Sequence, residues 1–271
     1  FGSSVADFFP SSTEAEAMRG LAASALFGAV AAQDPAEGWM AYAVGSIPAN
    51  AERITKIQMT WTVGAKPSRS FAFFSPWFGM DPADNLNLVQ PVNPWEGSNW
   101  GMYTEYYQWS PTHNSNSADH SVEPGQTLQG TVEYDASSDS YTLTQKIVET
   151  GVTSSQVVKC QSGKKYTIPY VVYEKTWPCK NYPSDGVVTF HDIVVECDGQ
   201  DCTSSVDWSA KIKDDNCNMA AHIDKDNNKI SITWDTSMES KYDNFTAAEL
   251  VELNSRGSGW GARFRSQSVV V

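Results

Sequence analysis

Short runs of β-branched and aromatic residues, each ended by glycine, proline, serine or asparagine, recur from about residue 38 to residue 236. Runs of this length and composition are typical of β-strands, and the stretches between them are too short for the helices of a βαβ sheet. The sequence therefore predicts an all-β protein of about ten strands, built as an antiparallel sandwich or barrel. The predicted strands are residues 39–44, 54–63, 71–74, 103–109, 127–134, 141–149, 170–174, 187–196, 206–212 and 229–234.

The clearest local signal is a hairpin at residues 126–144. Polar and apolar residues alternate along 127–134 and again along 141–144, and the Asp/Ser-rich segment 135–140 joins the two arms. Alternation with a period of two places one face of each arm against a core. We therefore expect antiparallel strand pairing.

Both ends of the chain differ from this pattern. Residues 13–16 have the capping-box form T-x-x-E and lead into an Ala/Leu-rich run, which predicts an N-terminal helix. Residues 247–253 have a helical pattern within a Glu/Asn/Thr-rich tail. We predict a helical arm at 1–37, a sandwich domain at 38–236 and a C-terminal appendage at 237–271. Assembly with neighbouring subunits would use the arm and the tail.

Charge and apolar run length exclude two kinds of partner. The chain has 19 Lys+Arg against 32 Asp+Glu, a formal net charge of −13 at pH 7, which disfavours nucleic acid. The longest apolar run, residues 21–32, is well short of the roughly 20 residues that a membrane-spanning helix needs. No nucleic-acid binding and no membrane span are predicted.

All five cysteines lie within residues 160–217, without a C-x-x-C pair. This spacing disfavours zinc and favours two disulfides with one leftover thiol. We expect Cys160 to bond Cys179, because the strand between them can return the chain. The sequon at Asn244 is a candidate glycosylation site. Together these features predict a secreted protein or one of a vesicular lumen.

No metal or cofactor is predicted. The four histidines lack ligand spacing, and residues 224–228 have the D-x-D-x-N opening of a calcium loop but place Lys229 where such a loop needs glycine. A hairpin turn is the better interpretation of that segment.

The order of motifs along the chain is more specific than any one of them. Residues 60–63 read Thr-Trp-Thr-Val at the end of a strand, residues 77–81 read Trp-Phe-Gly-Met-Asp, and Gln90 follows in an apolar segment. Residues 107–111, 123–128 and 186–190 follow in order. This succession resembles the glutamic peptidase (eqolisin) family. The resemblance implies that residues 77–81 match that family's W-x-G-[IM]-D turn and that Gln90 lies on the strand after it. The resemblance implies a two-sheet antiparallel β-sandwich, similar to concanavalin-type lectins.

The resemblance also implies a chemistry. In that family a Glu acts as general base on a water, while a Gln amide orients the water and hydrogen-bonds the oxyanion. Gln90 matches the Gln. An ungapped alignment puts Tyr170 at the position of the Glu and Glu174 four residues later, about 13 Å away at ~3.3 Å per residue. A gapped alignment puts Glu174 at that position, and we take Gln90 and Glu174 as the predicted dyad.

Further residues are assigned to substrate binding. Trp39 and Trp61 match positions that line the family's cleft, and Asp81 supports that cleft. Gln108 stands where the family has a Glu, and Glu105 lies three residues earlier, on the opposite strand face by parity. Tyr170 completes this set.

These inferences predict a secreted, acid-active endopeptidase that needs no cofactor. The first alternative is a catalytically inactive sandwich that binds a peptide or glycan in the same groove. The second is a structural or assembly subunit.

Overall fold

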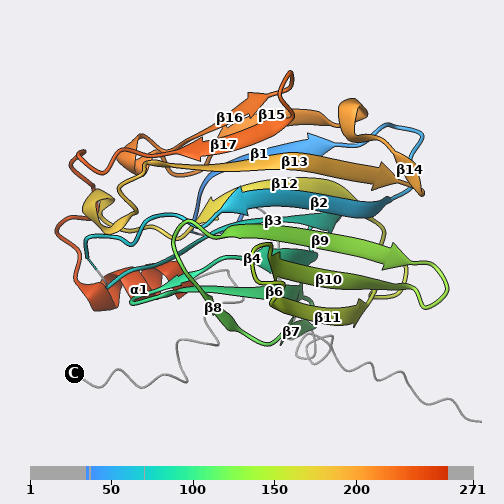
Figure 1. Cartoon of the computed structure of the whole chain (residues 1–271), viewed down its shortest axis with the longest axis horizontal. Helices are drawn as coiled ribbons and strands as arrows, with labels where there is room; N and C mark the ends of the chain where they lie inside the picture. Colours follow the sequence, from blue (N-terminus) through green and yellow to red (C-terminus); the bar gives the residue numbers. More distant parts are fainter. Residues whose placement is uncertain (1–34, 37, 70, 256–271) are drawn as a thin grey trace, which may run out of the picture. The chain divides into compact units, whose positions relative to one another are not determined.

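The computed structural model describes residues 35–36, 38–69 and 71–255, so the predicted N-terminal helix lies outside the described residues. Two antiparallel sheets make up the fold (Figure 1). This confirms the all-β, two-sheet prediction. The domain boundaries at residues 37 and 236 stay a prediction.

The nine-stranded sheet follows the order β15 (Asp207–Ile212), β1 (Trp39–Ser46), β12 (Tyr166–Glu174), β3 (Phe73–Pro82), β4 (Asn87–Val92), β6 (Trp100–Trp109) and β5 (Trp95–Glu96), and β7 (Thr112–Asn116) and β8 (His120–Val122) also pair with β6. The eight-stranded sheet follows the order β11 (Thr153–Lys159), β10 (Ser140–Ile147), β9 (Thr127–Asp135), β2 (Ile54–Thr62), β13 (Val187–Cys197), β17 (Lys229–Thr233) and β16 (Ala220–Asp224), with β14 (Gln200–Asp201) paired to β13. Short 3-10 helices η1 (Cys179–Asn181), η2 (Thr203–Ser205) and η3 (Asn216–Asn218) and one helix, α1 (Ala247–Ser255), complete the described elements.

Side-chain alternation divides the apolar residues into two clusters. The larger cluster lies between the sheets and includes Trp61 and Met59 of β2 and Phe78 and Met80 of β3. The smaller cluster contains residues of the nine-stranded sheet, such as Trp39, and lies on the opposite face of that sheet. We call this second face the outer face.

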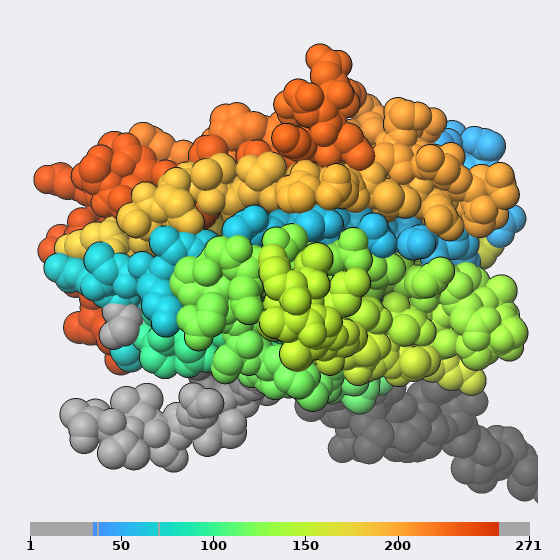
Figure 2. Space-filling view, in the orientation of Figure 1, coloured from blue at the N-terminus to red at the C-terminus, as the bar shows by residue number. Residues whose placement is uncertain are grey.

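The eight-stranded sheet is the layer seen in the space-filling view. Figure 2 shows β2, in blue, lying between β9, in green, and β13, in gold, as the sheet order requires. The predicted hairpin is the β9–β10 pair of this sheet, in which Tyr134 lies opposite Tyr141. The predicted antiparallel pairing is therefore confirmed.

One predicted turn is part of a strand. Residues 77–81 lie inside β3, and Trp77 is paired with Val172 of β12. The glycine of this motif, Gly79, therefore does not form a turn. It permits a close approach between strands, described below.

The C-terminal helix α1 packs on the sandwich. Thr246 and Glu249 form a capping box at its start, since the Glu249 carboxylate accepts from the Thr246 amide at 2.7 Å. Leu250 is buried and belongs to the larger apolar cluster. Near the end of the helix, the Asn254 side chain accepts from the Thr176 amide at 2.8 Å and donates to the Thr176 carbonyl at 2.9 Å. None of the described helices is long and apolar enough to cross a membrane.

The disulfide prediction was wrong in its pairing. Cys179 bonds Cys217, Cys197 bonds Cys202, and Cys160 is the free, buried thiol. Strand β12, which separates Cys160 from Cys179, spans nine residues, about 30 Å at ~3.3 Å per residue. It carries the chain from one end of the sheet to the other, so it does not return Cys179 to Cys160.

The two disulfides close loops of different length, which predicts different contributions to stability. The sequence separations are 38 residues for Cys179–Cys217 and 5 for Cys197–Cys202. In the chain-entropy model, the longer loop contributes about 4 kcal/mol and the shorter about 2 kcal/mol. Replacing each pair by alanines and measuring guanidinium unfolding should show the larger loss for the 179/217 pair. An equal or reversed order would contradict this.

Candidate functional site

Gln90 lies in a row of residues that crosses the nine-stranded sheet. On one side, Gln90 of β4 is paired with Glu105 of β6, and Glu105 with Asn116 of β7. On the other side, the β3–β4 register places Gly79 opposite Gln90, and Gly79 is paired with Tyr170 of β12. The row therefore runs Tyr170, Gly79, Gln90, Glu105 on neighbouring strands.

Gly79 lets β3 and β4 approach each other at this row. A Cβ atom at Gly79 would lie 2.5 Å from the carbonyl oxygen of Val89 and 3.0 Å from the Cβ atom of Gln90. Because the first of these neighbours is backbone, any side chain here would push the strands apart. The space between Tyr170 and Gln90 is thus kept free of a side chain.

The Gln90 amide is bonded to the Glu105 carboxylate. Gln90 Nε2 donates to Glu105 Oε2 at 2.7 Å, and Asn114 Nδ2, from β7, donates to Glu105 Oε1 at 2.6 Å. Gln90 Oε1 accepts no hydrogen bond from the described residues. The exposed fractions of residues Gln90 and Glu105 are 3% and 2%. We call Gln90 and Glu105 the amide–acid pair.

Burial sets the protonation of Glu105. Desolvation raises the pKa of its carboxyl above the ordinary value, and the negative charge of Glu174 acts in the same direction. The hydrogen bonds from Asn114 and Gln90 and the positive charge of Lys175 oppose this shift without cancelling it. A carboxyl with these properties, bonded to an amide, is typical of functional sites.

Glu174 belongs to a different cluster. Its Oε2 accepts from the Trp77 indole at 3.0 Å, and its Oε1 forms an ion pair with the fully buried Lys175. Lys175 Nζ also donates to the Asn254 carbonyl of α1 at 3.2 Å. The Gln90 amide thus finds its carboxylate partner in Glu105 rather than in Glu174. The register explains why, because Tyr170 lies in the row of Gln90 and Glu174 follows four residues later.

Tyr170 lies on the outer face with two of the predicted site residues. Asn85 Nδ2 donates to the Tyr170 hydroxyl and to Asp81 Oδ2, both at 3.1 Å. The Trp39 ring lies edge-on to the Tyr170 ring, with centroids 5.2 Å apart. Trp39, Asp81, Tyr170, Gln90 and Glu105 are therefore brought to one face.

Two other predicted site residues face away from it. Trp61 is fully buried between the sheets, against Phe78 and Phe190, and donates to Asn93 Oδ1 at 3.3 Å. It belongs to β2 of the other sheet, which is why it does not reach the outer face. Gln108 lies on the opposite side of β6 from Glu105 and accepts from the Tyr106 hydroxyl at 2.7 Å. The structure thus removes Trp61 and Gln108 from the predicted substrate face.

Three residues of the site were not predicted from the sequence. Asn114 and Asn85 follow β6 and β3, and only the strand register shows that they reach Glu105 and Tyr170. Lys175 belongs to no sequence motif that would have indicated its role. Asn244 is exposed, and its glycosylation stays a prediction. Among the described residues, no group of three or more His, Cys, Asp or Glu side chains is arranged to hold a metal ion.

Comparison with known proteins identifies the fold. No family model matches the chain, and no curated protein matches it. A crystal structure of scytalido-glutamic peptidase with a peptide-based transition state analog superposes with a TM-score of 0.55 and 18% identity, over 73% of this chain and 98% of that one. SCP-B, a member of the eqolisin family in a complex with the tripeptide Ala-Ile-His, superposes with a TM-score of 0.52 and 17% identity, over the same shares. The chain therefore has the fold of the glutamic peptidases, as the motif order suggested.

The raised pKa of Glu105 predicts a pH-dependent stability. A folded-state pKa above the unfolded one means that the folded protein binds this proton more tightly. The stabilisation that Glu105 contributes is therefore fully present below the unfolded pKa and is lost as the pH rises through the folded pKa. Guanidinium unfolding of the wild type and Glu105→Gln between about pH 4 and 7.5 should show the wild type losing stability relative to the variant.

Glu149 provides a matched control for this measurement. It is an exposed glutamate whose pKa is lowered by hydrogen bonds with Thr127. Against Glu149→Gln, the wild type should gain stability as the pH rises. Parallel curves for the wild type and Glu105→Gln would contradict the environment described for Glu105.

Proposed function

We propose that the protein hydrolyses peptide bonds on the outer face of the nine-stranded sheet, with Gln90 and Glu105 as the reacting groups. The observation that carries this proposal is the 2.7 Å hydrogen bond between the Gln90 amide and a Glu105 carboxyl of raised pKa. The fold of the glutamic peptidases supports the reaction class as an analogy.

The remaining bonding capacity of the pair suits a hydrolytic water. Gln90 Oε1 accepts nothing from the described residues, and Nε2 has a second hydrogen beyond the one given to Glu105. A water that donates to Gln90 Oε1 and to Glu105 would be oriented by both. The second Nε2 hydrogen would point to the oxygen of a substrate carbonyl.

The proposed reaction needs only one water molecule and the carboxyl group of Glu105. Ionised Glu105 takes a proton from the water as its oxygen attacks the carbonyl carbon, and the Nε2–H of Gln90 stabilises the oxyanion. Protonated Glu105 returns the proton to the leaving nitrogen as the C–N bond breaks. Glu105 must be ionised to begin, so turnover rises with pH through its raised pKa. The working range would lie higher than the acid range expected from the sequence.

Three polar side chains near the amide–acid pair hold the residues of the row in place. They are Asn114, Asn85 and Asp81. Asn114 fixes one oxygen of the Glu105 carboxylate, so that the other faces Gln90. Asn85 holds Asp81 and Tyr170 at the other end of the row. Two disulfides agree with the proposed location outside the cell or in a vesicular lumen.

Tyr170 favours a second candidate function. In the ungapped alignment it occupies the position of the family's catalytic Glu, and the structure places it in the row of Gln90, two strands away across Gly79. A phenol does not act as a base at neutral pH, since its ordinary pKa is about 10. The second candidate is therefore a protein that binds a peptide on the outer face without cleaving it.

Substitution of the pair separates these candidates. Glu105→Gln should abolish cleavage of an unfolded protein substrate, because an amide does not accept the proton of water. Gln90→Ala should lower kcat by about 10²- to 10³-fold, the usual loss for one oxyanion donor. Initial rates between about pH 3 and 8, measured by release of new amino termini, provide the comparison.

Two further variants make this test specific. The exposed Glu149→Gln should leave the rate unchanged. Glu174→Gln should retain cleavage in its folded fraction, and complete loss there would move the base to Glu174. Wild-type protein that binds unfolded substrate without releasing amino termini at any pH would favour the second candidate.

A further inference from the structure

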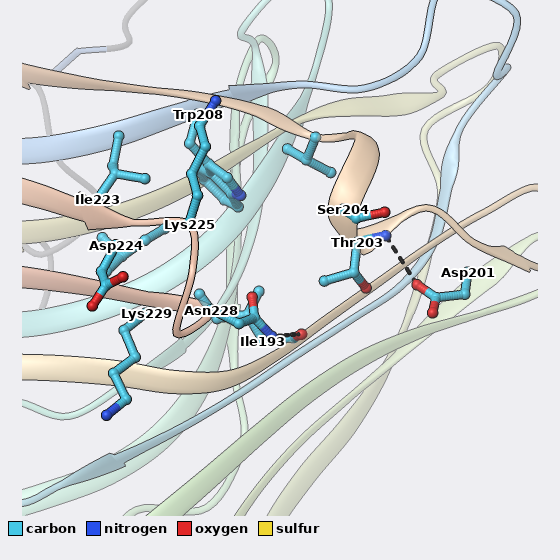
Figure 3. Close-up of a pocket in the computed structure, with 12 residues that line it drawn as sticks. Ile193, Asp201, Thr203, Ser204, Trp208, Ile223, Asp224, Lys225, Asn228 and Lys229 are labelled. Carbon is cyan, nitrogen blue, oxygen red and sulfur yellow. Dashed lines mark hydrogen bonds between the residues drawn. The ribbon is translucent and has the colours of Figure 1, made fainter.

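A pocket lies away from the outer face. It opens between the β16–β17 hairpin, β13, β15 and the η2 turn that follows the Cys197–Cys202 disulfide, and its volume is about 330 Å³ (Figure 3). This volume lies at the small end of the ligand-pocket range of ~300–1,000 Å³. Between β15 and β4 there are four strand spacings, about 19 Å at ~4.8 Å each. The pocket is therefore separate from the amide–acid pair.

The floor of the pocket is apolar and contains one aromatic ring. Ile193, Val206 and Ile230 are buried there, and Trp208 of β15 is half-buried beside them. The Trp208 indole N–H has no hydrogen-bond acceptor in the part of the chain that the structure describes. An indole with an apolar body and an available donor is suited to contact a ligand that has both kinds of surface.

The rim of the pocket is polar and carries no net charge. Asp201 and Asp224 supply two negative charges, and Lys225 and Lys229 supply two positive charges. Figure 3 shows these side chains among the residues that line the pocket, together with Ser204 and Asn228. Lys225 is also paired with Asp207 beside the pocket at 3.2 Å, so an anionic ligand would find no excess of positive charge.

Several rim groups retain hydrogen-bonding capacity. Asn228 Nδ2 donates to the Ile193 carbonyl at 2.8 Å, which leaves its Oδ1 as an acceptor. Asp201 Oδ1 accepts from the Thr203 amide at 2.9 Å, which leaves its Oδ2. Within the described residues, no hydrogen bond engages the Ser204 hydroxyl or the Lys229 ammonium, and Lys229 lies opposite Asp224 in the β16–β17 pair. The rim thus offers both donors and acceptors.

We propose that this pocket binds a neutral sugar ring, as a free oligosaccharide or as part of a glycan on another molecule. A pyranose has C–H groups on one face, which suit the electron-rich face of an indole. Its hydroxyl groups each donate and accept, which suits a rim of mixed polar groups without net charge. Such a site would hold the protein on a sugar-bearing surface or substrate, independently of the chemistry at Gln90.

Binding by the full chain tests this proposal. Isothermal titration and saturation-transfer NMR would use neutral trisaccharides of glucose, mannose and galactose, with oligogalacturonate as the charged comparator. At least one neutral trisaccharide should saturate with a Kd below about 10 mM, and Trp208→Ala should weaken it at least tenfold. A glycoprotein carrying the same sugar, compared with the free trisaccharide, distinguishes the two sources.

Three variants keep the result specific. Trp109→Ala removes a half-buried indole on the outer face and should leave sugar binding unchanged. Ser204→Tyr fills the pocket from its exposed rim without removing floor residues, so it should abolish binding even if Trp208→Ala fails to fold. Glu105→Gln should bind sugar like the wild type, whatever it does to peptide hydrolysis. No saturation by any neutral sugar, tighter binding of oligogalacturonate, or binding unaffected by Ser204→Tyr would overturn the proposal.

Discussion

Strand register across β12, β3, β4 and β6 decides which side chains meet at Gln90. The pairing of Tyr170 with Gly79 and of Gln90 with Glu105 is set by backbone hydrogen bonds, and a shift of one residue would turn every side chain to the other face. Gly79 maintains this arrangement because the Val89 carbonyl leaves no room for a Cβ atom. The amide–acid pair, the place of Tyr170 and the separation of Glu174 from Gln90 all depend on this register.

Glu174 and Glu105 both lie on the outer face, but their carboxylates have different partners. Glu174 has a buried ammonium beside it, since Lys175 lies against its carboxylate and is itself bonded to the end of α1. Glu105 has amide donors from Gln90 and Asn114 instead of an adjacent cation. Desolvation is the largest influence at Glu105, so the pKa of its carboxyl is raised above the ordinary glutamate value.

The sequence predicted the parts of this structure that depend on local pattern. The apolar and aromatic runs predicted the β9–β10 hairpin and many of the strands, but not β4, β11 or β16. The motif order pointed to Gln90 and to the fold. It did not predict Glu105 as the partner of Gln90, because 15 residues separate them and only the β4–β6 register brings them together. The same limit applies to Cys217, which reaches Cys179 across 38 residues. Trp61 was predicted on the substrate face but lies between the sheets. The sequence of an alternating strand has the same pattern whether the face with the tryptophan packs on the other sheet or contacts a substrate.

The most direct measurement is an NMR titration that follows the Glu105 carboxyl carbon and the Gln90 side-chain amide together. The account predicts that Glu105 titrates above the ordinary glutamate pKa and that the Gln90 Nε2 proton signals shift with the same midpoint. It also predicts that the Gln90 signals stop titrating in Glu105→Gln and continue to titrate in Glu149→Gln. A Glu105 carboxyl that titrates at the ordinary value, with Gln90 signals that do not respond to it, would contradict the amide–acid pair.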